Sequence, residues 1–177
     1  DPDEALQRLK ERSAAIHAQW EELMRIDDAI LRKIQFIEDS KSGIDYENFQ
    51  VVEYPERKYI PIGTEKEIYT GESFYFYPTL VFYGENRKEF GALLTDEAEE
   101  ENAEARTIPA GVYVVGYHKG PYEQIQDSFD RLRSWGKDLN LENDILAVNI
   151  IDQFVEQNNE NYSTRIEVRI GNNKLDD

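Results

Sequence analysis

The sequence predicts an α+β protein, in which a long N-terminal coiled-coil helix precedes one domain of two pseudo-symmetric βαββ units. Three observations predict this fold class. Apolar residues recur at alternating steps of three and four through the first 37 residues. Beyond them, strand-like apolar runs alternate with turn-forming residues. The order strand, helix, strand, strand then occurs twice, within residues 49–95 and 107–170.

The first element is the predicted dimerisation helix, residues 1–39, with its N-terminal cap near Asp3. Its apolar stripe has the spacing of a coiled-coil seam. Ser13 and Asp27 interrupt it, which indicates either a role in helix register or a place where the coil meets a domain. A helix of about 35 residues extends roughly 50 Å and cannot bury this stripe alone. We therefore expect pairing with a second chain. The predicted contact residues are Leu6, Leu9, Ile16, Trp20, Leu23, Ile30, Ile34 and Ile37.

A linker, residues 40–48, leads to the first βαββ unit. Phe49–Ile62 is a predicted strand despite two prolines, and Gly63–Gly71 is a candidate for a short helix. Phe74–Tyr83 and Glu89–Thr95 then form a predicted hairpin, in which Pro78 favours an edge strand or a bulge.

The second unit follows an acidic run, Asp96–Ala105, which we expect to be a solvated loop or a frayed helical turn. Ile108–Tyr117 is a predicted strand, and Gly120-Pro121 opens a helix with Pro at its first position. The apolar face of that helix is predicted to comprise Ile125, Phe129, Leu132 and Leu139. The closing strands are predicted at Ile145–Ile151 and Thr164–Ile170. The ligand-binding domain as a whole is predicted at residues 49–172, with 173–177 as a tail.

An internal echo supports the pairing of the two units. Residues 54–59 and 108–113 each place Pro and Tyr four positions apart at the start of a strand. One such match occurs easily by chance, so the matching order of elements gives it weight.

Composition excludes several classes of protein. The chain has no cysteine and two histidines, which excludes disulfide frameworks, thiol catalysis and His-rich metal sites. The formal charge is −17, of which −14 lies in residues 43–177. Such a field repels nucleic acid and anionic membranes and attracts cations, although strong acidity also serves solubility alone.

Other features bear on location and completeness. The longest apolar runs are far shorter than the ~20 residues of a membrane span, and the chain lacks the pattern of a signal peptide. The first residue is not Met, and the helix starts almost at once. We therefore expect a cytoplasmic protein that does not cross the membrane, and a sequence that is a piece of a longer one.

Aromatic residues indicate a binding pocket. Tyrosine and phenylalanine alternate on both faces of residues 74–83, which is more than a one-sided core needs. The alternative is a strand covered on both faces. The sequence offers no nucleophile–histidine set and no evident carboxylate pair, so we expect no enzyme, catalytic residue, cofactor or metal site. The predicted ligand-binding residues are Tyr69, Tyr75, Tyr77, Tyr113, Tyr117, Trp135, Asn149 and Tyr162, and Tyr122 is a further candidate.

Two polar residues receive other predictions. Glu167 alternates with Arg165 and Arg169, so we expect an outward ladder of ion pairs. His118 precedes a turn beside Lys119, and we expect it to be exposed.

Several motifs carry a resemblance to a known family. Residues 108–113 are similar to an Ile-Pro-x-Gly-x-Tyr motif, residues 74–78 to Phe-x-Phe-x-Pro, and residues 116–122 to Tyr-x-Gly-Pro-Tyr with one extra residue before the Gly. Tyr162 and residues 166–170 are similar to that family's closing strand. In order and spacing, the chain resembles the dimerisation helix and GyrI-like effector-binding domain of MerR-family multidrug-responsive transcriptional activators, of the Bmr-regulator type.

This resemblance implies a function. It implies a homodimer through an antiparallel coiled coil, and promoter DNA bound only by a missing N-terminal domain. The ligand would be a small lipophilic aromatic compound, often a cation, and tyrosine faces together with net acidity suit such a molecule. The family's drug-neutralising glutamate, however, falls on Ala147 here, and another family-typical acid falls on Arg165. A substitute acid or amide is then needed, or the ligand is neutral or anionic; the candidate substitutes are Asp144, Asn149, Asp152 and Glu167.

The same resemblance leaves two alternatives open. Some GyrI-like proteins hydrolyse reactive small molecules, and others inhibit gyrase as acidic protein-binding modules. Stand-alone inhibitors lack the long helix, which favours the transcription regulator.

Overall fold

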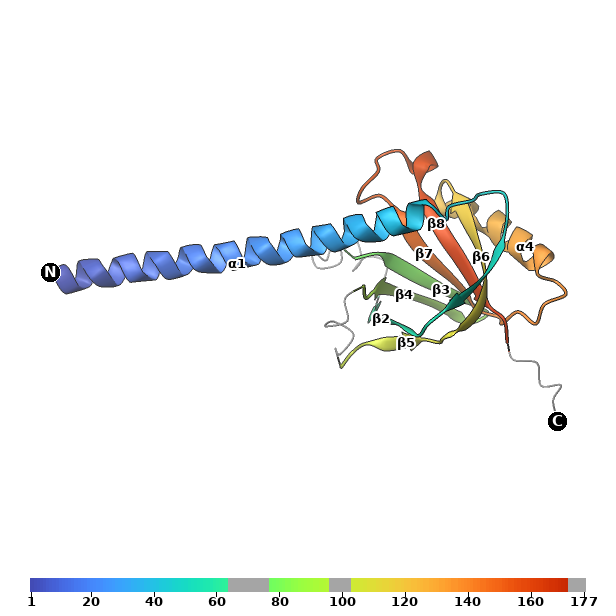
Figure 1. Cartoon of the computed structure of the whole chain (residues 1–177), viewed down its shortest axis with the longest axis horizontal. Coiled ribbons are helices and arrows are strands. Elements are labelled where there is room, and N and C mark those ends of the chain that lie inside the picture. Colours follow the sequence, from blue (N-terminus) through green and yellow to red (C-terminus); the bar gives the residue numbers. More distant parts are fainter. Residues whose placement is uncertain (64–76, 96–102, 172–177) are drawn as a thin grey trace.

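A computed structural model describes residues 1–63, 77–95 and 103–171. One long helix projects from one side of a β-rich domain (Figure 1). The predicted α+β class, with a long N-terminal helix ahead of the sheet, is confirmed.

Helix α1 runs from Pro2 to Lys41. Asp1, and not Asp3 as predicted, is the N-cap, because its carboxylate accepts a hydrogen bond of 3.0 Å from the Asp3 amide. Residues 1–25 are all exposed, and the helix meets the domain only through its C-terminal third.

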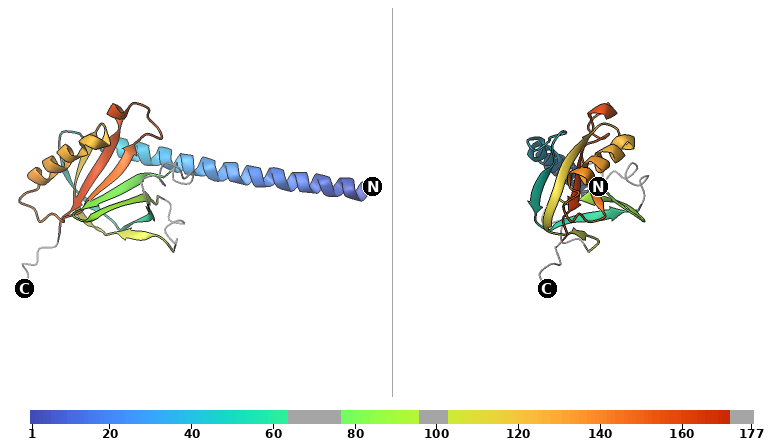
Figure 2. Two further views of the ribbon diagram at one scale, coloured as in Figure 1. Left: turned by 180° about the vertical axis from the view of Figure 1, so that it is seen from behind. Right: turned by 90° about the vertical axis from the view of Figure 1, so that its right-hand side faces the viewer.

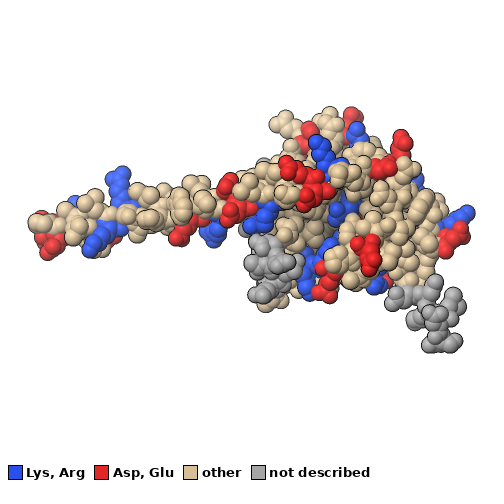
Figure 3. Space-filling model, in the orientation of Figure 1, with Lys and Arg blue, Asp and Glu red and all other residues tan. Residues whose placement is uncertain are grey.

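The predicted coiled-coil stripe is not the face that α1 turns to its own domain. Ala29, Lys33 and Ser40 are buried there, and Phe36 packs against the core of the sheet. The stripe residues stay exposed, Leu9 by 66% and Leu23 by 65%, and only Ile37 is partly buried. Charged side chains on the rod are interspersed with uncharged surface (Figure 3). The stripe therefore remains available for a partner along nearly all of its length.

The described part of the domain is one antiparallel sheet with the order β1-β6-β8-β7-β3-β4-β2-β5. It curls about its own axis (Figure 2). The strands are β1 Gln50–Tyr54, β2 Arg57–Ile62, β3 Thr79–Gly84, β4 Arg87–Leu93, β5 Arg106–Ile108, β6 Gly111–Lys119, β7 Ile145–Ile151 and β8 Ser163–Arg169. The helices beside it are η2 Tyr122–Gln124, α4 Ile125–Trp135 and η3 Asn159–Asn161.

The strand order is pseudo-symmetric. Strands β6-β8-β7 of the second unit meet β3-β4-β2 of the first at the β3–β7 pair. The first strand of each unit pairs with the other unit, β1 with β6 and β5 with β2. The helix proposed for the first unit falls almost wholly outside the described residues.

The two predicted long strands are each broken. Phe49–Ile62 is two strands, β1 and β2, and the segment predicted as Ile108–Tyr117 divides between β5 and β6. Pro55 and Pro109, which lack an amide hydrogen, follow the last residues of β1 and β5. The Pro echo in the sequence thus marks the two places where the chain crosses from one half of the sheet to the other.

The sheet has two faces with different cores. Helix α4 covers the outer face, where Phe129 and Leu132 pack against Val114 and Ile166. Leu139, predicted for the same helix, lies beyond its end at Trp135 and is 39% exposed. On the inner face, Leu80, Phe82 and Val148 form a second core that Phe36 of α1 contacts.

Candidate functional site

A pocket of about 340 Å³ opens on the outer face, beside the start of α4. Strands β3, β4 and β7 provide one side, and η2, α4 and the loop after β7 provide the other. We call it the α4-side pocket. Its lining residues are Thr79, Val81, Tyr83, Lys88, Phe90, Tyr122, Glu123, Ile125, Ala147, Asn149 and Gln153.

Hydrogen bonds fix the polar groups of this pocket. The Asn149 amide donates to the Thr79 hydroxyl at 2.7 Å, from β7 to the neighbouring β3. The Tyr122 hydroxyl donates to Gln153 at 3.1 Å. The ring of Tyr162 lies 5.3 Å from that of Tyr122. Of the predicted ligand-binding residues, Asn149 therefore lines the pocket and Tyr162 supports its wall.

The charged groups of this pocket are Lys88 and Glu123, both exposed. The Lys88 ammonium lies over the rings of Tyr83, at 5.7 Å, and Phe90, at 5.5 Å. Ala147 is buried in the same lining, where the family resemblance would place a glutamate. The described lining is thus aromatic and carries one cation and one anion near solvent.

Tyr77 lies next to this pocket and not in it. It packs with Phe90 and Phe154 against Ile62 and Ala92 on the outer face. Phe90 belongs to both groups, so Tyr77 contacts the pocket through one ring. Tyr69 and Tyr75 fall outside the described residues.

Tyr113 and Tyr117 lie on the inner face, together with a buried triad of charges. Glu167 accepts two hydrogen bonds from Arg57, at 2.6 and 3.0 Å, and one from Arg165 at 2.9 Å. Arg57 belongs to β2 and Glu167 to β8, which are four strands apart in the sheet, so the sheet must curl to bring them together. Glu167 is 1% exposed, and the predicted outward ladder is wrong.

Aromatic rings surround this triad. The Arg57 guanidinium lies 4.1 Å from the ring of Tyr54 and 5.2 Å from that of Tyr113. Burial raises the pKa of Tyr113 and Tyr117, while the neighbouring Arg57 and Arg165 oppose the shift, so both hydroxyls stay protonated at neutral pH. Tyr113 donates to the carbonyl of Pro109 at 2.5 Å. These tyrosines hold a packed and charged interior.

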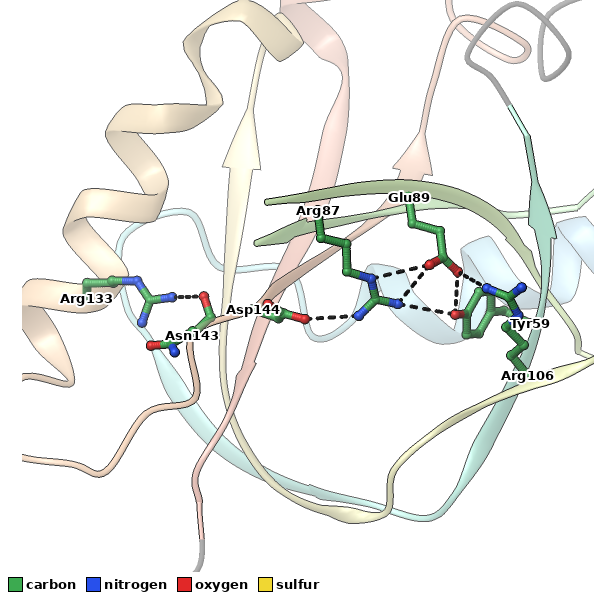
Figure 4. Close-up of polar contacts among 7 residues, drawn as sticks. All are labelled: Tyr59, Arg87, Glu89, Arg106, Arg133, Asn143 and Asp144. Atoms are coloured by element: carbon green, nitrogen blue, oxygen red, sulfur yellow. Dashed lines mark hydrogen bonds and ion pairs between the residues drawn. The ribbon is translucent and has the colours of Figure 1, made fainter. Parts of the chain in front are cut away.

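A further network lies at the open end of the inner face (Figure 4). Glu89 accepts from the Tyr59 hydroxyl at 2.6 Å and pairs with Arg87 and Arg106, and Arg87 also bonds Asp144 at 2.9 Å. Burial opposes ionisation of Glu89, but the hydrogen bonds from Tyr59 and Arg87 outweigh it and lower its pKa. A hollow of about 140 Å³ lies beside this network. Tyr113 lines it, together with paired charges such as Arg87 and Glu167 and with apolar residues such as Phe82.

Trp135 lies at a third place. Its ring is 5.8 Å from that of Phe49, and both line an open hollow of about 460 Å³ between α4 and the linker before β1. Gly116 permits this arrangement, because a Cβ there would stand 2.5 Å from the Phe49 ring. The hollow is larger than the α4-side pocket, but it has no residue in common with it.

His118 is buried, contrary to the prediction. Its Nδ1 lies 2.7 Å from the Ser128 hydroxyl and its Nε2 lies 2.9 Å from the Pro121 carbonyl. It ties the end of β6 to α4 and to the residue before Tyr122. His118 thereby positions one wall of the α4-side pocket.

A buried ion pair joins the loop beside the pocket to α1. The Lys33 ammonium lies 3.9 Å from the Asp152 carboxylate and 5.4 Å from the ring of Phe154. Burial lowers the pKa of Lys33 and raises that of Asp152, although each charge opposes the shift of the other. Gln153, which lies between Asp152 and Phe154 in this loop, lines the pocket. One residue, Asp152, therefore separates the pocket-lining Gln153 from Lys33 of the long helix.

Most of the pocket lining was not among the predicted ligand-binding residues, and the missed members include Lys88, Phe90 and Gln153. The hairpin offered a signal for Lys88 and Phe90. A two-residue turn at 85–86 pairs Tyr83 with Lys88 and Val81 with Phe90, which places all four on one face. Gln153 follows an irregularity in the β7–β8 register, which no local pattern announces.

No cluster of three or more His, Cys, Asp or Glu suited to a metal ion occurs in residues 1–63, 77–95 and 103–171. Over the same described ranges, none of the helices is long and apolar enough to span a membrane.

Comparison with solved structures shows related folds. The EcmrR–DNA complex in EcmrR-RPo matches at 18% identity and a TM-score of 0.54, over 87% of this chain and 69% of that one. SAV2435 bound to tetraphenylphosphonium matches at 10% identity and 0.52, over 70% and 94%. A hydrolase from Listeria innocua matches at 12% identity and 0.50, over 76% and 97%. At these identities the likeness shows the fold alone.

A family model gives the firmer result. No protein of curated function matches the chain. The model of the GyrI-like small molecule binding domain matches residues 10–170, which include the sheet, α4 and most of α1. The chain therefore belongs to the GyrI-like family of small-molecule binding domains.

Proposed function

We propose that this chain is the ligand-sensing and dimerising part of a MerR-family transcription regulator. A small lipophilic aromatic compound binds in the α4-side pocket, and the effect passes along α1 to a DNA-binding domain at the N-terminal side. The observation that carries the proposal is the contact between the pocket loop and α1, through Asp152 and Lys33. The EcmrR–DNA complex, whose fold resembles this chain, supports the class of protein.

The dimensions and lining of the pocket support an aromatic ligand. A volume of about 340 Å³ lies within the range of small-molecule sites. Tyr83, Phe90 and Tyr122 offer ring faces for stacking. Asn149 fixes a polar group in the lining, and Tyr162 backs Tyr122. Tyr69, Tyr75 and Tyr77 stay candidates for the same site, whereas Tyr113, Tyr117 and Trp135 lie on other surfaces.

The exposed stripe of α1 supports a homodimer. A projecting helix with Leu6, Leu9, Trp20 and Leu23 each more than half exposed has an apolar surface that a second copy would bury. An antiparallel pairing would place the two domains at opposite ends of the coil. Ligand binding in each domain would then change the geometry of the coil.

The relay follows from the packing of the loop after β7. A ligand that contacts Gln153 acts on the backbone between Asp152 and Phe154, and both of these contact Lys33 of α1. A ligand shifts such an equilibrium only by its difference in affinity between two positions of the loop. In this proposal, the Lys33–Asp152 ion pair is the contact between loop and helix that differs between the two positions of the loop.

Two measurements test the proposal. A panel of lipophilic aromatics should include compounds that raise the melting temperature, because ligands specific to the folded state stabilise it. Sedimentation should give a dimer for the chain and a monomer for the variant Leu9→Glu/Leu23→Glu, whereas Gln7→Glu on the neighbouring helix surface should leave the dimer intact. Absence of any stabilising compound, or a monomeric wild type, contradicts the proposal.

The likeness to a hydrolase raises a second candidate function. The chain would then turn over a reactive small molecule in the same pocket, with Glu123 as the carboxylate that lines it. We propose binding without turnover, because Glu123 is exposed and lies near solvent, where its carboxylate is poorly placed for general-acid chemistry. Product formation from a strained electrophile, lost in Glu123→Gln, would establish the enzyme instead.

A further inference from the structure

We propose that the α4-side pocket selects flat aromatic anions, with Lys88 as the group that binds the acid, and discriminates against lipophilic cations. This inference rests on the proposed function, since it names the class of ligand for the same pocket. The net charge of −17 favours the opposite preference at long range. The inference therefore depends on the local arrangement of charge, which salt screens less than the distant charges.

The first argument is the position of Lys88. Its ammonium lies 5.7 Å from the ring centre of Tyr83 and 5.5 Å from that of Phe90, the two rings that β3 and β4 give to the pocket. A ligand that contacts either ring therefore lies close to this ammonium. An acid group at that edge gains a charge-assisted hydrogen bond, whereas a cation there meets a like charge.

The second argument is where the carboxylates are. The three acids named above as candidate substitutes for the residue at Ala147 are each engaged elsewhere. Glu167 lies on the other face of the sheet between two guanidinium groups, and Asp144 bonds Arg87 at 2.9 Å. Asp152 is buried beside Lys33. These three carboxylates are thus committed to arginine or lysine partners.

The third argument is the chemistry of the lining. Ala147 and Asn149 are the residues that β7 presents, and neither bears a charge. A cation that loses its water in the pocket needs a carboxylate to offset that loss. Among the described lining residues, Glu123 is the only acid, and it is exposed on the wall away from β4. An aromatic acid avoids the loss, because its charged edge stays near solvent beside Lys88.

The test uses three ligands that share one naphthalene ring and differ in charge: 2-naphthoate, 2-naphthamide and 2-naphthyltrimethylammonium. Calorimetry at physiological salt should give affinities in that order, with about a tenfold difference between the first and the last, the scale of one charge-assisted hydrogen bond. Lys88→Met should weaken naphthoate about tenfold and leave naphthamide within about twofold.

A matched control separates the local effect from net charge. Lys119 is also an exposed lysine beside an aromatic ring, 5.7 Å from that of Tyr46, and it does not line the pocket. Lys119→Met makes the same change in charge and should leave all three affinities unchanged. Melting temperatures of both variants should stay close to that of the wild type, because both side chains are exposed.

The outcomes distinguish the two levels of the account. The order naphthoate, naphthamide, ammonium compound, reduced only by Lys88→Met, supports the inference. Preference for the ammonium compound, or equal loss in both lysine variants, overturns the inference and leaves the proposed function in place. No binding of any of the three overturns the inference, whereas the proposed function falls only if the wider panel of aromatics also contains no stabilising compound.

Discussion

The two faces of the sheet both bring tyrosines next to charged groups, yet they differ in how those charges are satisfied. On the inner face, Glu167 is saturated by Arg57 and Arg165, and the rings of Tyr54 and Tyr113 close over the pairs. On the outer face, Lys88 lies over rings that border a hollow of about 340 Å³. Aromatic content alone therefore does not locate a ligand site, and our proposal of the outer face rests on its pocket and on the neighbouring charges.

The largest expected effect is a loss of stability when the carboxylate of the buried triad on the inner face is removed. Glu167→Gln leaves two buried guanidinium groups without a counter-charge and should lower the free energy of unfolding by about 3–5 kcal/mol. Denaturant unfolding measures the loss. Glu142→Gln, which removes the exposed carboxylate paired with Arg169, should cost less than about 1 kcal/mol. Similar losses for the two variants would contradict the structural role of the triad.

The next effect concerns the link between the pocket and α1. Asp152→Asn leaves the buried Lys33 ammonium without its carboxylate and should cost about 3 kcal/mol. The double variant Lys33→Met/Asp152→Asn removes both charges and should recover most of that loss. A double-mutant cycle on unfolding free energies checks the coupling. Additive losses would mean that the two residues do not act as a pair.

The same pair predicts a dependence on pH. The pKa of Asp152 is raised in the folded state, so its contribution is most favourable below the unfolded pKa near 3.8 and is lost as the pH rises through the folded value. The pKa of Lys33 is lowered, so its contribution is most favourable above 10.5 and is lost as the pH falls through the folded value. Relative to the double variant, the wild type should therefore be least stable near neutral pH. A constant difference between pH 4 and 8 would contradict this.

A smaller effect on stability and on ligand affinity is expected at the α4-side pocket of the outer face. Asn149→Leu removes the donor to Thr79, whose buried hydroxyl then lacks that partner, and should cost about 1–2 kcal/mol. Ligand affinity should fall as well if Asn149 orders the lining. Calorimetry with the best ligand of the panel tests the second part. Unchanged affinity would remove Asn149 from the proposed site.

Local patterns in the sequence were enough to predict those elements that depend on residues close together in the chain. The strands β4, β7 and β8 and the apolar face of α4 at Ile125, Phe129 and Leu132 were predicted close to their observed positions. The strand predicted at Phe74–Tyr83 instead begins at Thr79, after Pro78, and pairs on both sides, so the edge strand or bulge expected at Pro78 is wrong. Periodicity and turn residues determine these elements directly. The long helix followed in the same way from its stripe.

Distant contacts explain what the sequence could not predict. Glu167 turns inward because Arg57, 110 residues away in the chain, reaches it across the curled sheet. His118 is buried because Ser128 and Pro121 take both of its ring nitrogens. Period-two alternation does not tell which face of a strand is hollow. In β6 the tyrosines at 113 and 117 face inward, whereas in β3 Thr79, Val81 and Tyr83 face the pocket.

One measurement tests the central claim most directly: the affinity of the best aromatic ligand for two variants that alter opposite faces. Val81→Phe fills the α4-side pocket, and Tyr117→Phe removes a hydroxyl from the inner face. The account predicts that Val81→Phe weakens binding at least about tenfold and that Tyr117→Phe leaves it within about twofold, while both variants melt cooperatively. Loss of binding in Tyr117→Phe, with full affinity in Val81→Phe, would place the ligand on the inner face and contradict the account.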